Sequence, residues 1–252
     1  MRLFEMKSEH FELSDVAKIA STLDFHRKFA EAQKITEDFI AMCKKPAVSF
    51  GGGKDSMAVL IIAQTIDPDI MILCADPPNP LTGREEHLRN VSQVCHSDII
   101  HVSYDWDVRA VLNGELKYPD GLKKTILWQA QLEHEIDGII WGCRISESWG
   151  RRMNFAKNGY IYDNGRTKIC QPIAKWSAYE VLALACVTGY PINPVYEKMD
   201  GYYDLDRIHD GTWWPHETSG VKGDWIKRYY PEHYENYKTA EALKSKWNDA
   251  IW

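Results

Sequence analysis

The chain has 252 residues, enough for one sizeable α/β domain with or without an extension. Its hydrophobic content of 44% and charged content of 26% are ordinary for a soluble globular protein, and its net charge of −6 argues against a broad nucleic-acid-binding surface. No apolar run approaches the length of a membrane span, and residues 1–7 lack the apolar region of a signal peptide, so we expect a cytoplasmic protein without a membrane partner.

The cysteine pattern bears on redox chemistry. Six cysteines are scattered along the chain, and no two of them form a Cys-x-x-Cys pair. In a cytoplasmic setting we expect them to be reduced, and their spacing matches neither a zinc site nor an iron–sulfur site. The sequence therefore predicts no iron–sulfur cluster. The six are Cys43, Cys74, Cys95, Cys143, Cys170 and Cys186.

The first predicted elements are helical. Between residues 14 and 45, apolar residues recur at helical spacing with charges between them, which predicts one or two amphipathic helices. Ser14 or Asp15 has the side chain of an N-cap. We assign residues 1–45 to an N-terminal helical segment that packs on the first strand or forms a dimer contact.

A phosphate-binding loop is predicted next. An apolar run from residue 47 ends in three glycines, and Lys54, Asp55 and Ser56 then open an apolar-periodic segment, which predicts a strand, a turn and a helix. Glycines let consecutive N–H groups approach an anion, and the first helical turn adds unpaired donors and a positive dipole end. The alternative is a glycine-rich turn that binds no ligand. Ordering three glycines costs conformational entropy on folding, which argues against that alternative. The candidate nucleotide contacts here are Ser49, Gly51, Gly52, Gly53 and Ser56.

A second buried strand, at residues 69–76, ends in a carboxylate. Ligands bind at the carboxyl ends of parallel strands in doubly wound folds, so we interpret Asp76 as a contact to a ribose or to Mg²⁺. Asp55 is the other candidate Mg²⁺ ligand. The alternative for Asp76 is a turn residue before two prolines, because aspartate often begins turns. A helix over residues 84–94 follows.

The remaining elements of the sheet alternate with helices. Strands are expected at residues 98–103 and 138–142, with a helix at 125–135 between them, while Asn113-Gly114 and a Pro-Asp-Gly turn make residues 108–124 mostly loop. This alternation predicts an α/β fold with a parallel sheet and crossover helices on both faces.

A charged segment follows the strand at residues 138–142. Gly142 ends the strand, and Arg144, Glu147, Arg151 and Arg152 lie within nine residues of one another. Arginine presents a planar fork that suits phosphate or sulfate, and a nearby carboxylate can orient it. Taken alone, the segment is better explained as a solvated charged loop, because charge clusters are common.

A third block, at residues 171–196, is interpreted as structural. Ser177 and Glu180 have the spacing of a capping box at the start of a helix. A Pro-x-Asn-Pro-x-Tyr segment ending at Tyr196 follows that helix. We expect this block to close one side of the pocket.

The glycine-rich loop matches neither common nucleotide-binding pattern. It is not a Walker A motif, because Val48 stands where the first glycine should be and Asp55 follows the lysine. It is not Gly-x-Gly-x-x-Gly either, because Ser56 replaces the last glycine. It resembles the PP-loop, Ser-Gly-Gly-Lys-Asp-Ser, of the N-type ATP pyrophosphatase and PAPS (3'-phosphoadenosine 5'-phosphosulfate) reductase superfamily, with Gly51 in place of the first serine.

The other two blocks resemble the PAPS reductase-like branch of that superfamily. The charged segment is similar to its Gly-x-Arg-x-x-Glu-Ser motif followed by arginine, which faces the phosphate or sulfonate end of the nucleotide. The resemblance implies a Rossmann-like (adenine nucleotide alpha hydrolase-like) domain over residues 46–196. With this assignment the candidate catalytic residues are Lys54, Asp55, Arg144, Glu147 and Arg151, and Gly142 joins the nucleotide contacts.

Residues 197–252 depart from that family and are assigned to a helical, aromatic-rich C-terminal extension whose final helix spans residues 232–252. Sulfonucleotide reductases carry a nucleophilic cysteine near the C-terminus, and no cysteine follows Cys186. Cys143 is the candidate replacement thiol. Four residues of the extension have side chains that can ligate a metal, but surface or capping roles are favoured because their spacing matches no known site. They are His209, Asp210, His216 and Glu217.

Three functions follow from these features. The first is an enzyme that uses ATP and Mg²⁺, cleaves ATP between its α- and β-phosphates, and adenylates a substrate or supports sulfur transfer. The second is sulfonucleotide reductase-type activity on a 3'-phosphorylated adenine nucleotide. The third is a non-catalytic module that binds an adenine nucleotide and acts with a partner protein. We rank them in this order, and the acceptor and the choice between a homodimer and another partner stay open.

Overall fold

The computed structural model describes residues 16–103, 106–117, 122–198, 212–215 and 219–249. Within these ranges the chain forms one six-stranded sheet with the strand order β3-β2-β1-β4-β6-β5. All neighbouring strands are parallel except β5 and β6, which are antiparallel. The strands are β1 (Pro46–Phe50), β2 (Met71–Asp76), β3 (Ile99–Ser103), β4 (Gly138–Trp141), β5 (Ile161–Asp163) and β6 (Lys168–Cys170).

Helices connect the strands and form both ends of the described chain. The α-helices are α2 (Leu23–Met42), α3 (Lys54–Gln64), α4 (Arg84–Ser92), α5 (Val108–Leu112), α6 (Leu122–Glu133), α7 (Trp149–Asn158), α8 (Ala178–Thr188), α9 (Ser219–Tyr229) and α10 (Tyr234–Asp249). Short 3₁₀ helices are η2 (Lys18–Ser21), η3 (Pro194–Glu197) and η4 (Pro231–His233). None of the helices in the described ranges is long and apolar enough to cross a bilayer.

The two faces of the sheet are buried in two separate cores. Successive side chains of a strand point to opposite faces, so Val48 and Ile140 enter the larger core with α3 and α8, while Leu73 and Ile139 enter a smaller core with Ala130 of α6. Because helices cover both faces, the central strands are apolar on both sides. The predicted α/β fold, with helices on both faces of a mostly parallel sheet, is confirmed.

The sheet departs from the fully parallel prediction at one edge. Strands β5 and β6 form a short hairpin whose turn contains Asn164 and Gly165, and Gly165 adopts a φ of +84°. The Asp163 carboxylate accepts a hydrogen bond from the Gly165 N–H at 2.7 Å, which stabilises the turn. The Asn-Gly pair was the sequence signal for this hairpin, but three-residue strands carry too little alternation to be recognised.

A short helix interrupts the segment predicted to be mostly loop. The Asp107 side chain caps α5 by accepting a hydrogen bond from the Ala110 N–H at 2.9 Å, and Val111 is buried in the larger core. Capping and tertiary packing stabilise a helix too short to form alone.

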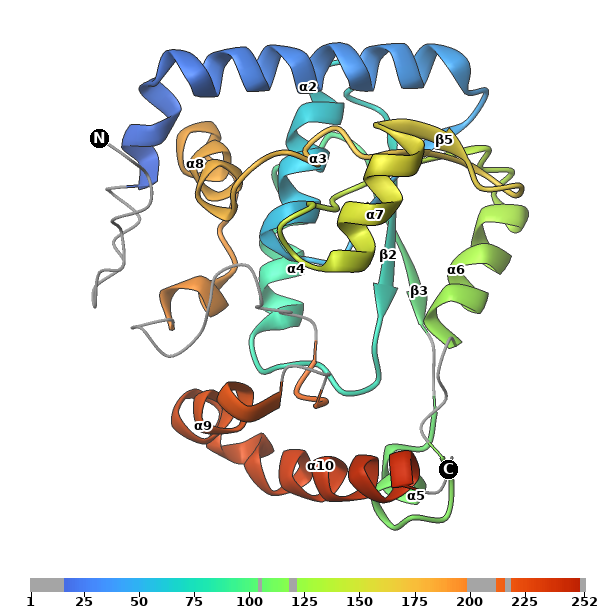
Figure 1. The fold of residues 1–252 in the computed structure, drawn as a ribbon, viewed down its shortest axis with the longest axis vertical. Helices are drawn as coiled ribbons and strands as arrows, with labels where there is room; N and C mark the ends of the chain where they lie inside the picture. The colour runs from blue at the N-terminus through green and yellow to red at the C-terminus, as the bar shows by residue number, and fades with distance from the viewer. Residues whose placement is uncertain (1–15, 104–105, 118–121, 199–211, 216–218, 250–252) are drawn as a thin grey trace.

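The carboxyl ends of the strands face the C-terminal helices. In Figure 1 the arrow of β2 points toward the end of the molecule at which α9 and α10 lie, whereas α2 crosses the opposite end. The chain leaves β1 for β2 and β3 on one side and returns to β4 on the other side of β1. This reversal between β1 and β4 is the position at which open α/β sheets bind ligands.

Candidate functional site

The two motifs that the sequence singled out meet at the reversal point. Strand β1 leads into the glycine-rich loop and α3, and the neighbouring strand β4 leads into the charged segment before α7. A Cβ atom added to Gly142 would lie 2.4 Å from the Asp55 carbonyl oxygen and 2.8 Å from the Ser56 nitrogen. Only glycine therefore allows the charged segment to approach the first turn of α3 this closely.

The loop itself is held in shape by backbone geometry and one hydroxyl. Gly52 has a φ of +88°, a conformation that favours glycine, and Gly53 is the N-cap of α3. The Ser56 hydroxyl accepts a hydrogen bond from the Gly51 N–H at 3.1 Å and donates one to the Gly53 carbonyl at 2.9 Å. Ser56 thus closes the loop onto the helix, a role that the sequence did not reveal.

The inner side of the loop is packed against three side chains from other elements. His87 Nε2 donates to the Gly52 carbonyl at 3.0 Å, and Asn193 Nδ2 donates to the same oxygen at 3.1 Å. The Tyr196 hydroxyl accepts a hydrogen bond from the Lys54 N–H at 2.8 Å, at the N-terminus of α3. The Pro-x-Asn-Pro-x-Tyr segment thus packs against the loop. The histidine in α4 gave no sequence signal for its contact.

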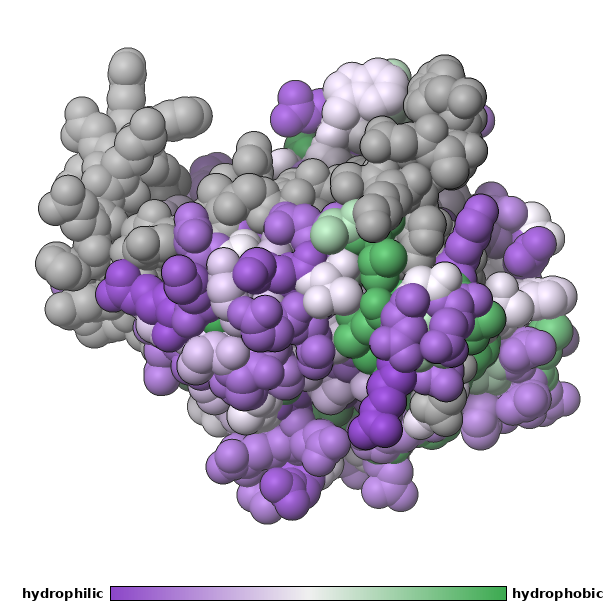
Figure 2. Space-filling view, turned by 90° about the horizontal axis from the view of Figure 1, so that it is seen from below, coloured by the Kyte–Doolittle hydropathy of each residue, from purple (hydrophilic) through white to green (hydrophobic). Residues whose placement is uncertain are grey.

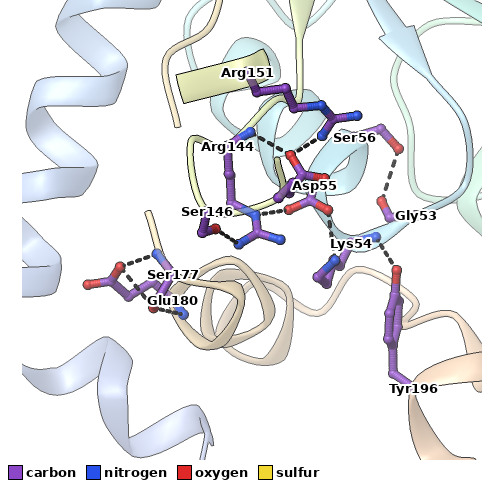
Figure 3. A network of polar contacts seen from close by, with 11 residues as sticks. Gly53, Lys54, Asp55, Ser56, Arg144, Ser146, Arg151, Ser177, Glu180 and Tyr196 are labelled. Atoms are coloured by element: carbon purple, nitrogen blue, oxygen red, sulfur yellow. Dashed lines mark hydrogen bonds and ion pairs between the residues drawn. The ribbon is translucent and has the colours of Figure 1, made fainter. Parts of the chain in front are cut away.

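A buried charge cluster lies directly beyond the loop. The Lys54 ammonium is 2.8 Å from one oxygen of Asp55, and Arg144 Nε donates to the other oxygen. The side chains of Lys54 and Arg144 are 1% and 0% exposed. Burial opposes ionisation of Asp55, but the two cations outweigh it and hold the pKa of its carboxyl below the usual range. Figure 3 shows Lys54 and Arg144 approaching Asp55 from two sides.

Glu147 and Arg151 extend this cluster toward solvent. Glu147 accepts a hydrogen bond from the Arg144 N–H at 2.6 Å and forms an ion pair with Arg151. Arg151 is 34% exposed and is therefore the most accessible of the three cations. Three cations and two carboxylates leave the cluster with one formal positive charge. This excess charge, together with the positive end of the α3 dipole, favours an anion at this position.

Asp76 lies in a separate group of side chains. Its two oxygens accept hydrogen bonds from Arg84 Nη1 at 2.9 Å and from His101 Nδ1 at 2.6 Å, and Cys74 Sγ is 3.6 Å away. Burial opposes ionisation, but Arg84 and His101 lower the pKa of the Asp76 carboxyl. In the described ranges, no hydrogen bond or ion pair joins Asp76 to the cluster around Asp55.

The carboxylates do not form a ready site for a resident Mg²⁺ ion. Carboxylate oxygen is the donor type that Mg²⁺ prefers, but each oxygen of Asp55 and of Asp76 already contacts a cationic group or a histidine N–H. A metal ion would have to displace one of these partners. The donor set of Asp55 and Asp76 therefore does not fit a resident Mg²⁺ ion.

Cys143 is poorly placed to act as a nucleophile. Its side chain is 4% exposed, and burial raises the pKa of the thiol to about 12. The thiolate, rather than the thiol, attacks sulfur. Cys143 is therefore neither accessible to a substrate nor ionised near neutral pH. Ser49, a predicted nucleotide contact, is partly buried on β1, where it pairs with Leu73 of β2 and Trp141 of β4. The four tail residues considered as metal ligands lie outside the described ranges: His209, Asp210, His216 and Glu217.

Comparison with known proteins finds similarity in structure alone. No family model matches the sequence, and no curated protein matches it. Candida glabrata FMN adenylyltransferase in complex with FAD and inorganic pyrophosphate superposes with a TM-score of 0.54 at 14% identity, over 73% of this chain and 65% of that chain. The same enzyme in complex with ATP gives 0.52 at 16% identity, over 73% and 64%. Candida auris PAPS reductase, in a phosphate complex, gives 0.55 at 13% identity, over 79% and 93%.

These similarities establish the fold. The chain has the Rossmann-like architecture shared by these nucleotide-utilising proteins, as the resemblance to the PP-loop superfamily implied. It spans slightly less than two thirds of the FMN adenylyltransferase chains.

Proposed function

We propose that this chain is a PP-loop enzyme that binds ATP, cleaves the bond between its α- and β-phosphates, and transfers AMP to an acceptor with release of pyrophosphate. The observation that carries the proposal is the junction of the two loops at Gly142, which brings the N-terminus of α3 against a cluster with excess positive charge. Pyrophosphate is the most highly charged group in the reaction, and such a junction suits it.

In this mechanism the loop holds the β- and γ-phosphates. An acceptor oxygen attacks the α-phosphorus, a new O–P bond forms, and the bond to the bridging oxygen of the β-phosphate breaks, so that its electron pair leaves with pyrophosphate. Arg151, the most accessible cation of the cluster, neutralises the charge that develops on the leaving group. Mg²⁺ enters as part of the ATP complex and supplies further charge neutralisation on the phosphates.

The buried residues of the cluster position the accessible ones. Asp55 joins Lys54 to Arg144, and Glu147 joins the Arg144 backbone to Arg151. Lys54 and Arg144 are almost fully buried. We therefore propose that they maintain the shape and the positive charge of the site and do not contact the AMP group during its transfer. Lys54 would contact phosphate only by leaving Asp55.

The alternative sulfonucleotide reductase activity lacks a nucleophile. The chain has no cysteine after Cys186, and Cys143 is buried with a raised thiol pKa. The structural similarity to FMN adenylyltransferase, captured with FAD and pyrophosphate, favours adenylyl transfer as the first activity to test. A non-catalytic nucleotide-binding role would appear as ATP binding without turnover for every acceptor.

The test is pyrophosphate release from ATP and Mg²⁺ in the presence of a panel of acceptors that begins with FMN. We expect acceptor-dependent release that Arg151→Gln lowers by about 10²-fold, the usual effect of removing one group that stabilises the transition state. Arg152→Gln is the matched control, because Arg152 is the adjacent arginine and is exposed. Failure to bind ATP, or equal loss in both variants, would contradict the proposal.

A further inference from the structure

A second site lies beyond the strand next to the loop. A cavity of about 640 Å³ is bounded by the turn that follows β2, by α5, and by residues of the C-terminal extension. Its volume falls within the range of small-molecule sites. Figure 2 views the molecule from below, where a small hydrophobic area has hydrophilic residues along part of its border. Apolar side chains supply much of the lining: Pro78, Pro80, Leu81, Val108, Leu112 and Trp213.

The cavity and the glycine-rich loop lie beyond neighbouring strands of the sheet. Cys74 of β2 pairs with Phe50 of β1, the residue before the glycine-rich loop. Pro78, the first cavity residue, is four positions beyond Cys74, which corresponds to at most about 13 Å of extended chain. Both features lie at the carboxyl edge of the sheet, where the substrates of α/β enzymes bind.

Aromatic side chains form one wall of the cavity. The rings of Trp213 and His233 are 20° from parallel with centroids 6.2 Å apart, and Trp214 lies behind Trp213 at 6.0 Å. The Thr82 hydroxyl donates a hydrogen bond to Glu232 at 2.6 Å and lies 3.0 Å from His233 Nε2. These two contacts connect the turn after β2 to η4. Aromatic walls of this kind favour flat rings, which stack on or pack edge-on against them.

One charge of each sign lies at the cavity lining. Arg109 and Glu85 are both exposed, and in the described part of the chain no ion pair engages either side chain. The guanidinium of Arg109 matches a carboxylate in shape and charge. Burial lowers the pKa of His233, so its ring adds no positive charge near neutral pH.

We propose that this cavity binds an aromatic or heteroaromatic carboxylate and that this carboxylate is the acceptor. The assignment rests on the adenylyl transfer proposed above. A carboxylate oxygen attacks the α-phosphorus of ATP, the bond to the β-phosphate oxygen breaks, and an acyl adenylate and pyrophosphate form. The ring packs against Trp213 and the apolar lining, and the carboxylate contacts Arg109 before the attack.

The experiment measures binding without turnover. Ligand-detected NMR titrates the full chain with 1-naphthoate and with cyclohexanecarboxylate, and the same samples are titrated with ATP. We expect saturable binding of 1-naphthoate that Arg109→Gln weakens by about tenfold or more, since a hydrogen bond between charged groups is lost. Leu112→Trp, which fills the cavity, should abolish binding, and Arg89→Gln, an exposed arginine that does not line the cavity, should leave it unchanged.

Three results would overturn the assignment: no saturable binding of 1-naphthoate, equal affinity for cyclohexanecarboxylate, or unchanged affinity in both cavity variants. Because Arg109 is exposed, its variant keeps the test valid even where Leu112→Trp perturbs folding. The absence of ATP binding would contradict the proposed function and is measured separately from 1-naphthoate binding. Ser56→Ala should weaken ATP binding and leave 1-naphthoate binding unchanged.

Discussion

Replacing Asp55 with asparagine tests the charge cluster most severely. The substitution keeps the size of the side chain but removes the charge that compensates Lys54 and Arg144, whose side chains are 1% and 0% exposed. Removing one partner of a buried ion pair costs about 3–5 kcal/mol, because the remaining charge is left uncompensated in the interior. We therefore expect Asp55→Asn to lower the free energy of unfolding by about 3–5 kcal/mol, a large part of the total for most domains.

Urea denaturation followed by circular dichroism measures this loss, with the slope of the transition checked for equality between variants. Asp98→Asn is the matched control, because Asp98 is exposed and the described part of the chain gives it no ion pair. It should change stability by no more than about 0.5 kcal/mol. A loss below about 1 kcal/mol in Asp55→Asn would mean that Lys54 and Arg144 do not depend on this carboxylate for charge compensation.

Three further predictions concern the loop. Gly142→Ala places a methyl group 2.4 Å from the Asp55 carbonyl oxygen, so it should cost about 1–3 kcal/mol and weaken ATP binding, whereas Gly150→Ala, with its nearest atom at 4.0 Å, should do neither. Gly51→Ser, which restores the superfamily serine, meets no atom within 4 Å and should raise stability by about 0.4–1 kcal/mol in thermal unfolding; a loss would contradict this. Burial lowers the pKa of His87 from 6.5 to about 4, so its contribution is complete above pH 6.5 and is lost as the pH falls toward 4. Stability should drop by up to about 3 kcal/mol over that window, and His87→Gln should flatten the profile.

The sequence predicted the sheet and the motifs well because their signals are local. Apolar runs bounded by turn residues located β1 to β4 within about two residues, a common margin for element boundaries. The capping box of Ser177 and Glu180 is present as predicted. The close approach of the two motif segments followed from the strand order of the fold rather than from spacing.

The parts that were missed depend on tertiary contacts. His87 reaches the loop from α4, and the Tyr196 hydroxyl reaches the N-terminus of α3 across 142 positions of the chain. Asp76 was interpreted as a ligand contact from its place at a strand end, and that interpretation stays a prediction. The sequence did not show that Arg84 forms an ion pair with this carboxylate or that His101 donates a hydrogen bond to it. The cavity beside α5 also escaped notice, because its walls come from three separate segments.

Calorimetric titration of the protein with ATP and Mg²⁺, and separately with 3'-phosphoadenosine 5'-phosphate, distinguishes adenylyl transfer from sulfonucleotide chemistry. We expect ATP to bind more tightly than 3'-phosphoadenosine 5'-phosphate. Arg151→Gln should weaken ATP binding by about tenfold or more, and Arg152→Gln should leave it unchanged. Tighter binding of the 3'-phosphorylated nucleotide, or no binding of ATP, would contradict adenylyl transfer at this site.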